Sequence, residues 1–178
     1  MAHHNAQLTY APDAAVPAEL PPPTMSRLRL VPGDAGRGVM DGGWWPRSRD
    51  AASELTELVT ALIERLGMVT RVTVNFDDWG HVPLRITVLG QEIWVGWSPH
   101  LDHMVAMTCG RADPVLLLVV PPEASRSSAE AALARAAVEA GGAMPEEILA
   151  SCDISTAPVF CSEFYFRNFG LLNLYRVG

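Results

Sequence analysis

The stretch DAASELTELVTALIERLG, residues 50–67, contains the clearest predicted element of the chain. Asp50 is a candidate N-cap, Glu54 and Glu57 suit the positive end of a helix, and Gly67 suits the position just after its last turn. The apolar residues between these ends recur at helical spacing and predict one buried stripe, which consists of Leu55, Leu58, Val59, Leu62, Ile63 and Leu66. We therefore expect an amphipathic helix that packs this stripe against other elements.

Extended segments surround this helix on both sides. Short strands are expected over residues 28–32 and 39–45 before it. After it, alternating residues predict a strand over 68–76, a hairpin formed by 82–88 and 92–97, and a strand over 103–109. The run 115–120 is apolar on both faces, which is typical of a strand at the centre of a sheet. An Ala-rich helix then extends to about Ala140, with Ser127 and Glu130 in a capping-box pattern.

This order of elements predicts an α+β domain. We expect a mainly antiparallel twisted sheet of about six to seven strands, with two helices packed on one face. Two helices cannot cover both faces of so wide a sheet, so the other face would meet solvent or a partner, or would curl into a half-barrel. That face is expected to carry polar and aromatic side chains, namely Arg71, Thr73, Asn75, Arg85, Thr87, Glu92 and Trp94.

Composition divides the chain into three parts. Residues 1–25 form a Pro/Ala-rich segment that we expect to be a disordered arm. Residues 26–142 are expected to form the α+β domain, and residues 143–178 an aromatic-rich C-terminal tail. The tail could be an added strand pair, a docking segment or an end without an evolved role, and its sequence does not separate these readings.

Charge and cysteine usage exclude several classes of function. The formal net charge is −7, which disfavours binding to nucleic acid. All 13 basic residues are arginine, which excludes a Schiff-base lysine, a P-loop lysine and a lysine general base. The three cysteines lack CxxC spacing, so we expect a reducing, cytoplasmic location, with neither a disulfide framework nor structural zinc. We expect no association with a membrane, because apolar runs are short and no signal peptide is visible.

Three blocks of sequence resemble a known family. The run 38–50, GVMDGGWWPRSRD, looks like the signature of an uncharacterised actinobacterial domain family. The blocks at 71–79, RVTVNFDDW, and 117–122, LLVVPP, resemble later parts of the same family. The resemblance covers about Arg27 to Ala140 and implies membership of a family without an assigned activity.

The corner that follows the second strand is the richest candidate site. Trp44 and Trp45 must point to opposite sides of an extended chain, so one can fill the core while the other is left at the uncovered face or its rim. Arg47 and Arg49, beside a helix N-terminus, could grip a carboxylate or phosphate. In the structural alternative, these arginines pair with nearby carboxylates and lock the corner.

Further polar residues complete the candidate set. Asn75, Asp77, Trp79 and His81 cluster with Asp78 at a strand end, where they could form an acid–base set, a weak metal site or an ordinary turn. The pair His100 and His103 lacks enough ligands nearby for a convincing zinc site, and no cofactor is expected. The candidate ligand-binding residues are therefore Trp44, Trp45, Arg47, Arg49, Asn75, Asp77, Trp79, His81 and Trp94.

Two functions from different classes remain open. The leading hypothesis is a non-enzymatic domain that binds a small acidic ligand, a protein partner or a second copy of itself as a homodimer. It would use the exposed sheet face and the corner formed by Trp44, Trp45 and Arg47. The alternative is a small enzyme in which Arg47 and Arg49 clamp an anion while Asp77 or His81 acts as acid or base.

Overall fold

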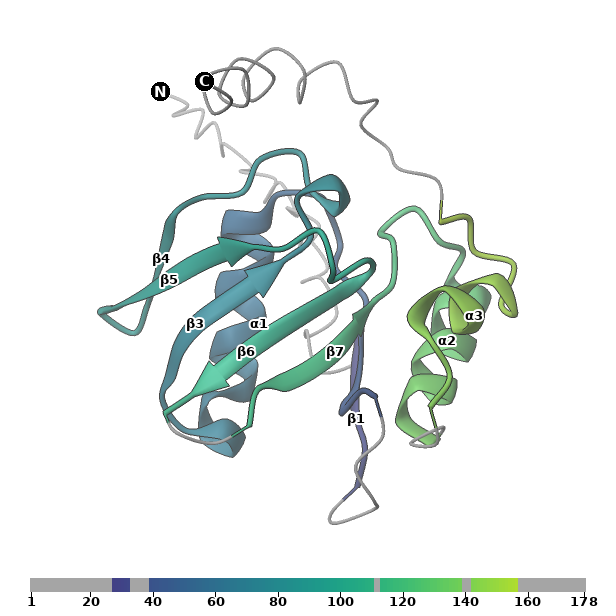
Figure 1. The fold of residues 1–178 in the computed structure, drawn as a ribbon, viewed down its shortest axis with the longest axis horizontal. Coiled ribbons are helices and arrows are strands. Elements are labelled where there is room, and N and C mark those ends of the chain that lie inside the picture. The colour runs from purple at the N-terminus through teal and green to yellow at the C-terminus, as the bar shows by residue number, and fades with distance from the viewer. Residues whose placement is uncertain (1–26, 33–38, 111–112, 139–141, 157–178) are drawn as a thin grey trace, which may run out of the picture.

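The computed structural model describes residues 27–32, 39–110, 113–138 and 142–156. The expected N-terminal arm, 1–25, and most of the expected aromatic tail, 157–178, lie outside these residues. Within them the chain forms an α+β fold with one sheet (Figure 1). The elements are β1 (Leu28–Leu30), β2 (Gly42–Trp44), α1 (Ala51–Leu66), β3 (Val69–Val74), the 3₁₀ helix η2 (Phe76–Asp78), β4 (Arg85–Val88), β5 (Gln91–Trp97), β6 (Met104–Cys109), β7 (Val115–Val119), α2 (Arg126–Val138) and α3 (Pro145–Ala150).

The sheet is mixed rather than uniformly antiparallel. Its strand order is β1-β2-β7-β6-β3-β5-β4. The pairs β2/β7 and β3/β5 are parallel, whereas the other four neighbouring pairs are antiparallel. As a result β2, β7, β3 and β5 all end at the same edge of the sheet. The run 115–120 was expected at the centre, and β7 does lie between β2 and β6.

The helices cover opposite faces, which corrects the expectation that they share one. Leu117 and Val119 of β7 pack in the core cluster that contains the apolar stripe of α1. Leu118 and Val120 pack in a second cluster with α2 and α3. Successive residues of a strand point to opposite faces, so the two clusters lie on the two sides of the sheet. The continuous apolar run of β7 exists because both of its faces are buried.

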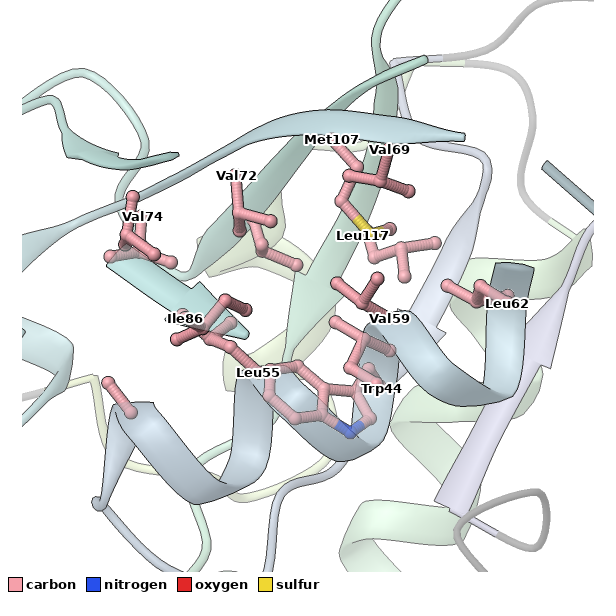
Figure 2. Packing of buried hydrophobic residues seen from close by; sticks show 14 of the residues in the cluster. Trp44, Leu55, Val59, Leu62, Val69, Val72, Val74, Ile86, Met107 and Leu117 are labelled. Atoms are coloured by element: carbon pink, nitrogen blue, oxygen red, sulfur yellow. The ribbon is translucent and has the colours of Figure 1, made fainter. Parts of the chain in front are cut away.

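The first core cluster is built on α1, much as its sequence predicts. Figure 2 shows Leu55, Val59 and Leu62 of the helix packed among side chains from the sheet. Asp50 is the N-cap, because its side chain accepts a hydrogen bond from the N–H of Ala52. Gly67 follows the helix with a φ of 73°, a left-handed value that glycine adopts without steric cost.

The second cluster depends on close approach between α2 and the sheet. A Cβ built on Gly43 of β2 would lie 3.1 Å from side-chain atoms of Ala136 and Leu133, so the helix lies almost directly on the strand. The alanines of α2 make this approach sterically feasible. The cap differs from the prediction: the hydroxyl of Ser125, not Ser127, accepts the N–H of Ser128. In Figure 1, α2 and α3 lie together beside β1 and β7.

Part of the second face is covered by no described element. Figure 1 shows β3, β5 and β6 with no helix in front of them. Here Arg71, Trp94 and Arg85 lie side by side on three neighbouring strands, and Trp94 is 52% exposed. The guanidinium of Arg85 lies 4.0 Å from the centre of the Trp94 ring.

Among the described residues, no helix is long and apolar enough to cross a membrane.

Candidate functional site

The two adjacent tryptophans are core residues. Trp44 belongs to the cluster on the α1 side and Trp45 to the cluster on the α2 side, so they point to opposite faces as expected. Neither is left uncovered, because they are only 1% and 8% exposed. Trp44 stacks on Trp79 with ring centroids 5.7 Å apart, and the guanidinium of Arg27 lies over the Trp45 ring. The tryptophan pair therefore joins the two cores.

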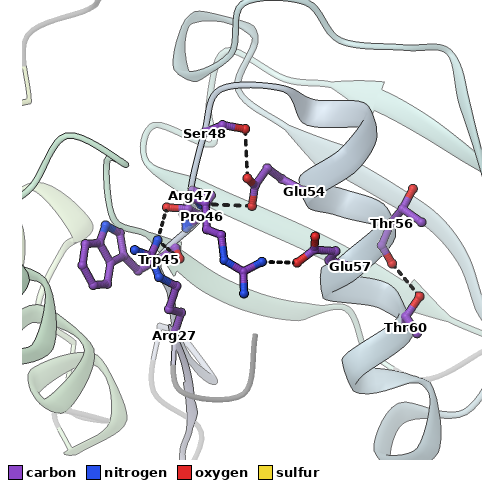
Figure 3. Close-up of polar contacts among 9 residues, drawn as sticks. All are labelled: Arg27, Trp45, Pro46, Arg47, Ser48, Glu54, Thr56, Glu57 and Thr60. Carbon is purple, nitrogen blue, oxygen red and sulfur yellow. Dashed lines mark hydrogen bonds and ion pairs between the residues drawn. The ribbon is translucent and has the colours of Figure 1, made fainter. Parts of the chain in front are cut away.

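The segment between these tryptophans and α1 is held by a buried carboxylate (Figure 3). Glu54 accepts hydrogen bonds from the backbone N–H of Arg47, at 3.1 Å, and from the hydroxyl of Ser48, at 2.9 Å. The guanidinium of Arg47 pairs with Glu57. This geometry matches the structural alternative for Arg47, although the carboxylates come from α1 rather than from aspartates near the corner.

Arg49 points to a different place. Its guanidinium makes two hydrogen bonds of 2.7 Å to the carboxylate of Glu123 and a third, of 2.6 Å, to the carbonyl of Asp78. It thereby ties the segment before α1 to η2 and to the loop after β7. The hydrogen bonds from Arg49 hold the pKa of Glu123 below its ordinary value.

A pocket of about 480 Å³ opens beside this arginine. It lies at the sheet edge where β2, β3 and β7 end and β6 begins, on the side of α2. Crevices at the carboxyl ends of parallel strands are recurrent ligand sites in open sheets. Most of the lining residues are polar or charged, and they come from five separate segments: Arg49, Asp77, Asp78, His103, Pro121, Glu123, Ala124, Ser125, Ser128, Asp153, Ile154 and Ser155.

A histidine and an aspartate form a paired unit in the wall of the pocket. Nδ1 of His103 lies 3.2 Å from Oδ1 of Asp78, and the two side chains are only 13% and 11% exposed. Burial alone would lower the pKa of His103, but the hydrogen bond and charge of Asp78, with smaller contributions from Thr156 and Asp102, raise it. The contact with Asp78 therefore favours the protonated form of His103.

The lining carries two residues with unusual backbone angles. His103 has a φ of 54° and Asp153 a φ of 57°. Left-handed values are uncommon outside glycine, and the surrounding structure must impose them on a histidine. Both side chains are thus presented to the pocket by fixed turns.

Beneath the pocket lies a cavity of about 10 Å³, the size of a single water molecule. It shares Arg49, Asp78 and His103 with the larger pocket and is also lined by Trp79. Within the described part of the chain, Oδ2 of Asp78 and Nε1–H of Trp79 are buried without a hydrogen-bond partner. Buried polar atoms nearly always have a hydrogen-bond partner, so an acceptor and a donor left without one beside this cavity are unusual.

Some of the candidate residues expected from the sequence lie at or near the pocket, and the others lie elsewhere. Arg49 and Asp77 line the main pocket, and Trp79 lies just beneath it. Asn75 is buried and caps η2 by accepting the N–H of Asp77. The remaining nominated residues lie elsewhere: Trp44 and Trp45 in the cores, Arg47 at α1, His81 exposed in a bridge to Asp50, and Trp94 on the open sheet face.

Sequence reasoning passed over several lining residues. From the sequence, His103 is a candidate only as a zinc ligand, and Asp78 only as a member of the cluster after β3 or as a partner of the corner arginines. Ser125, Ser128 and Asp153 were not considered. His103 immediately precedes the apolar strand β6, and Asp77 and Asp78 follow β3 by a few residues. They meet at one edge of the sheet because β3 and β6 are antiparallel neighbours, and the sequence does not specify that pairing.

The fold and the pocket define an α+β protein with a polar crevice at one edge of a mixed sheet. Comparison with known families gives a match to a family of unknown function, DUF5994, over residues 27–136. The chain belongs to this family, whose extent corresponds closely to the resemblance expected over Arg27 to Ala140. No curated protein and no solved structure matches the chain significantly.

Proposed function

We propose that this protein binds a small polar molecule in the pocket beside Arg49, Asp78 and His103. The observation that carries the proposal is the combination of a roughly 480 Å³ pocket with a largely buried His–Asp pair in its wall. Clefts of about 300–1,000 Å³ with convergent polar groups are the usual location of small-molecule sites. Here polar groups converge on the space from five segments of chain.

The way the pocket is constructed supports ligand binding. Arg49 connects three of the lining segments through its bonds to Glu123 and Asp78. The 3₁₀ helix η2 is fixed by its Asn75 cap, and the amide of Asn75 also donates to Asp102, beside His103. Preorganised polar groups of this kind reduce the cost of ordering a site when a ligand binds.

A fragment screen observed by NMR tests the proposal. We expect small polar fragments to shift amide resonances of residues 77–78, 103, 123–128 and 153–155. Ser128→Trp should abolish these shifts by filling the pocket from the first turns of α2. Ser127→Trp is the matched control, because Ser127 is exposed on the same helix and does not line the pocket. Shifts that cluster elsewhere, or that persist in Ser128→Trp, would refute the proposal.

A second candidate function is catalysis. The observation that favours it is the contact between His103 and Asp78, since a carboxylate that orients an imidazole is a recurrent acid–base arrangement. In this version Asp78 and His103 take the role that the sequence suggested for Asp77 and His81. Conversion of a fragment that binds the wild type, lost in His103→Asn while binding persists, would distinguish an enzyme from a binding protein.

The open sheet face supports a further candidate, interaction with a protein partner or a second copy. Arg71, Trp94 and Arg85 form a row on adjacent strands, with Trp94 half exposed. Exposed aromatic and arginine side chains are enriched at protein interfaces. Sedimentation velocity over a concentration series, on wild type and on Trp94→Ala with Arg71→Ala, tests self-association; identical behaviour of the two would count against the homodimer.

A further inference from the structure

We infer that the ligand of the pocket is a small organic cation, held by Asp77 and Asp153. This inference rests on the proposed function and specifies its ligand class. Four carboxylates line the pocket, from Asp77, Asp78, Glu123 and Asp153, against one arginine and one histidine. The excess of negative charge raises the local concentration of cations.

The two positive groups of the lining already contact protein acceptors. Arg49 uses three of its five N–H donors on Glu123 and on the Asp78 carbonyl. His103 faces Asp78 at 3.2 Å. An anionic ligand would share these groups with their internal partners, and it would also meet the other carboxylates of the lining.

The two negative groups left over are Asp77 and Asp153. Their side chains make no hydrogen bond or ion pair with the described residues, and both residues are exposed at the pocket. They come from different segments of the lining, Asp77 from η2 and Asp153 from the segment after α3. Two exposed carboxylates in one pocket are suited to a ligand with ammonium groups.

The positive end of α2 does not reverse this preference. Ala124, Ser125 and Ser128 bring that end to the pocket, but the hydroxyl of Ser125 already accepts the N–H of Ser128. Glu123, three residues before the helix begins, adds a negative charge beside it. The helix end is therefore compensated from within its own loop.

An organic cation fits better than a metal ion. Among the described residues, no group of three or more histidine, cysteine or carboxylate side chains is close enough together to hold a metal. The carboxylates are instead spread over a volume that accommodates several non-hydrogen atoms.

A charge series of probes with equal chain length tests the inference at neutral pH. Putrescine, butanediol and succinate each have a four-carbon chain and end in ammonium, hydroxyl or carboxylate groups. We expect putrescine to shift resonances of Asp77 and Asp153 and to bind at least about tenfold more tightly than the other two. Raising the salt concentration should weaken this binding, because the pair of carboxylates is exposed.

Two double variants isolate the role of the carboxylates. D77N/D153N should weaken putrescine binding about fivefold to tenfold, as expected for two exposed ion pairs. E64Q/E146Q removes the same amount of charge from exposed residues outside the pocket and should leave binding unchanged. Circular dichroism and unfolding curves verify that both variants fold.

Three results of these experiments would contradict the assignment of an organic cation. Preference for succinate, absence of any response to putrescine, or equal effects of the two double variants would overturn the inference. The proposed function fails separately, if no fragment of any charge perturbs the pocket or if Ser128→Trp leaves all perturbations in place.

Discussion

Glu54 shows how much one side chain does at the residue scale. The sequence predicted it as a carboxylate in the first turn of α1, where it favours the positive helix end. The structure adds that it is buried and accepts from the backbone of Arg47 and the hydroxyl of Ser48. Its carboxylate therefore fixes the segment that leads to Arg49 and the pocket.

Replacing Glu54 tests this role. Glu54→Ala should lower the free energy of unfolding by about 2–3 kcal/mol, because it strands a buried donor and removes charge-assisted hydrogen bonds. Glu54→Gln keeps one acceptor oxygen and should lose less. Glu57→Ala, which removes an exposed pair, should cost under about 1 kcal/mol. Equal losses for Glu54→Ala and Glu57→Ala in urea denaturation would contradict the assignment.

His103 links the pocket to pH. Its folded pKa is raised above the ordinary value of 6.5, so the protonated form stabilises the fold. This contribution is complete below pH 6.5 and is lost as pH rises through the folded pKa. His103→Asn should therefore cost more stability near pH 6 than in mildly alkaline buffer; asparagine is chosen because it tolerates the left-handed backbone. A cost that does not change with pH would contradict the raised pKa.

At the scale of elements, local patterns predicted most helices and strands but not their arrangement. The stripe of α1, its caps and the hairpin β4/β5 are encoded by residues close in sequence. The parallel pairs β2/β7 and β3/β5 join segments far apart, and no local pattern specifies them. The short α3 lay in the segment expected to be an aromatic tail, where six residues give little periodicity.

The contact between α2 and β2 gives a prediction for the second face. Gly43→Ala places a methyl group 3.1 Å from side-chain atoms of Leu133 and Ala136, so these side chains must give way by a few tenths of an ångström, and we expect a loss of about 1–3 kcal/mol. Gly96→Ala is the matched control on the open part of the same face, where the nearest atom is 3.7 Å away. Thermal unfolding compares them. Equal stability of the two variants would show that α2 does not lie so close to the sheet.

At the scale of the whole molecule, the pocket was beyond prediction because it depends on strand order. Arg49, Asp78 and His103 are separated by 29 and 25 positions and meet only because β2, β3, β6 and β7 share an edge. An antiparallel arrangement would have placed some of these strand ends at the far edge. The expected site therefore contained Arg49 and Asp77 but not the residues facing them.

The described fold extends past residue 142, and its last segment closes both the core and the pocket. Cys152 and Ile154 are buried in the second cluster, and Asp153 and Ser155 line the pocket. A chain that ends at 150 should therefore be about 2–5 kcal/mol less stable than one that ends at 156, since two buried apolar side chains are lost. Denaturation of the two chains compares them, and equal stability would show that this segment contributes little.

Trp79, which stacks on Trp44, lines the small cavity that shares residues with the pocket, while Trp94 and Trp97 are about half exposed. The intrinsic fluorescence of the protein thus has two spatially distinct components. A water-soluble quencher reaches the outer pair first, and the emission that survives quenching comes from indoles in the interior. Because Trp79 lies beside residues that line both the cavity and the pocket, we expect a bound ligand to alter the interior component of the emission.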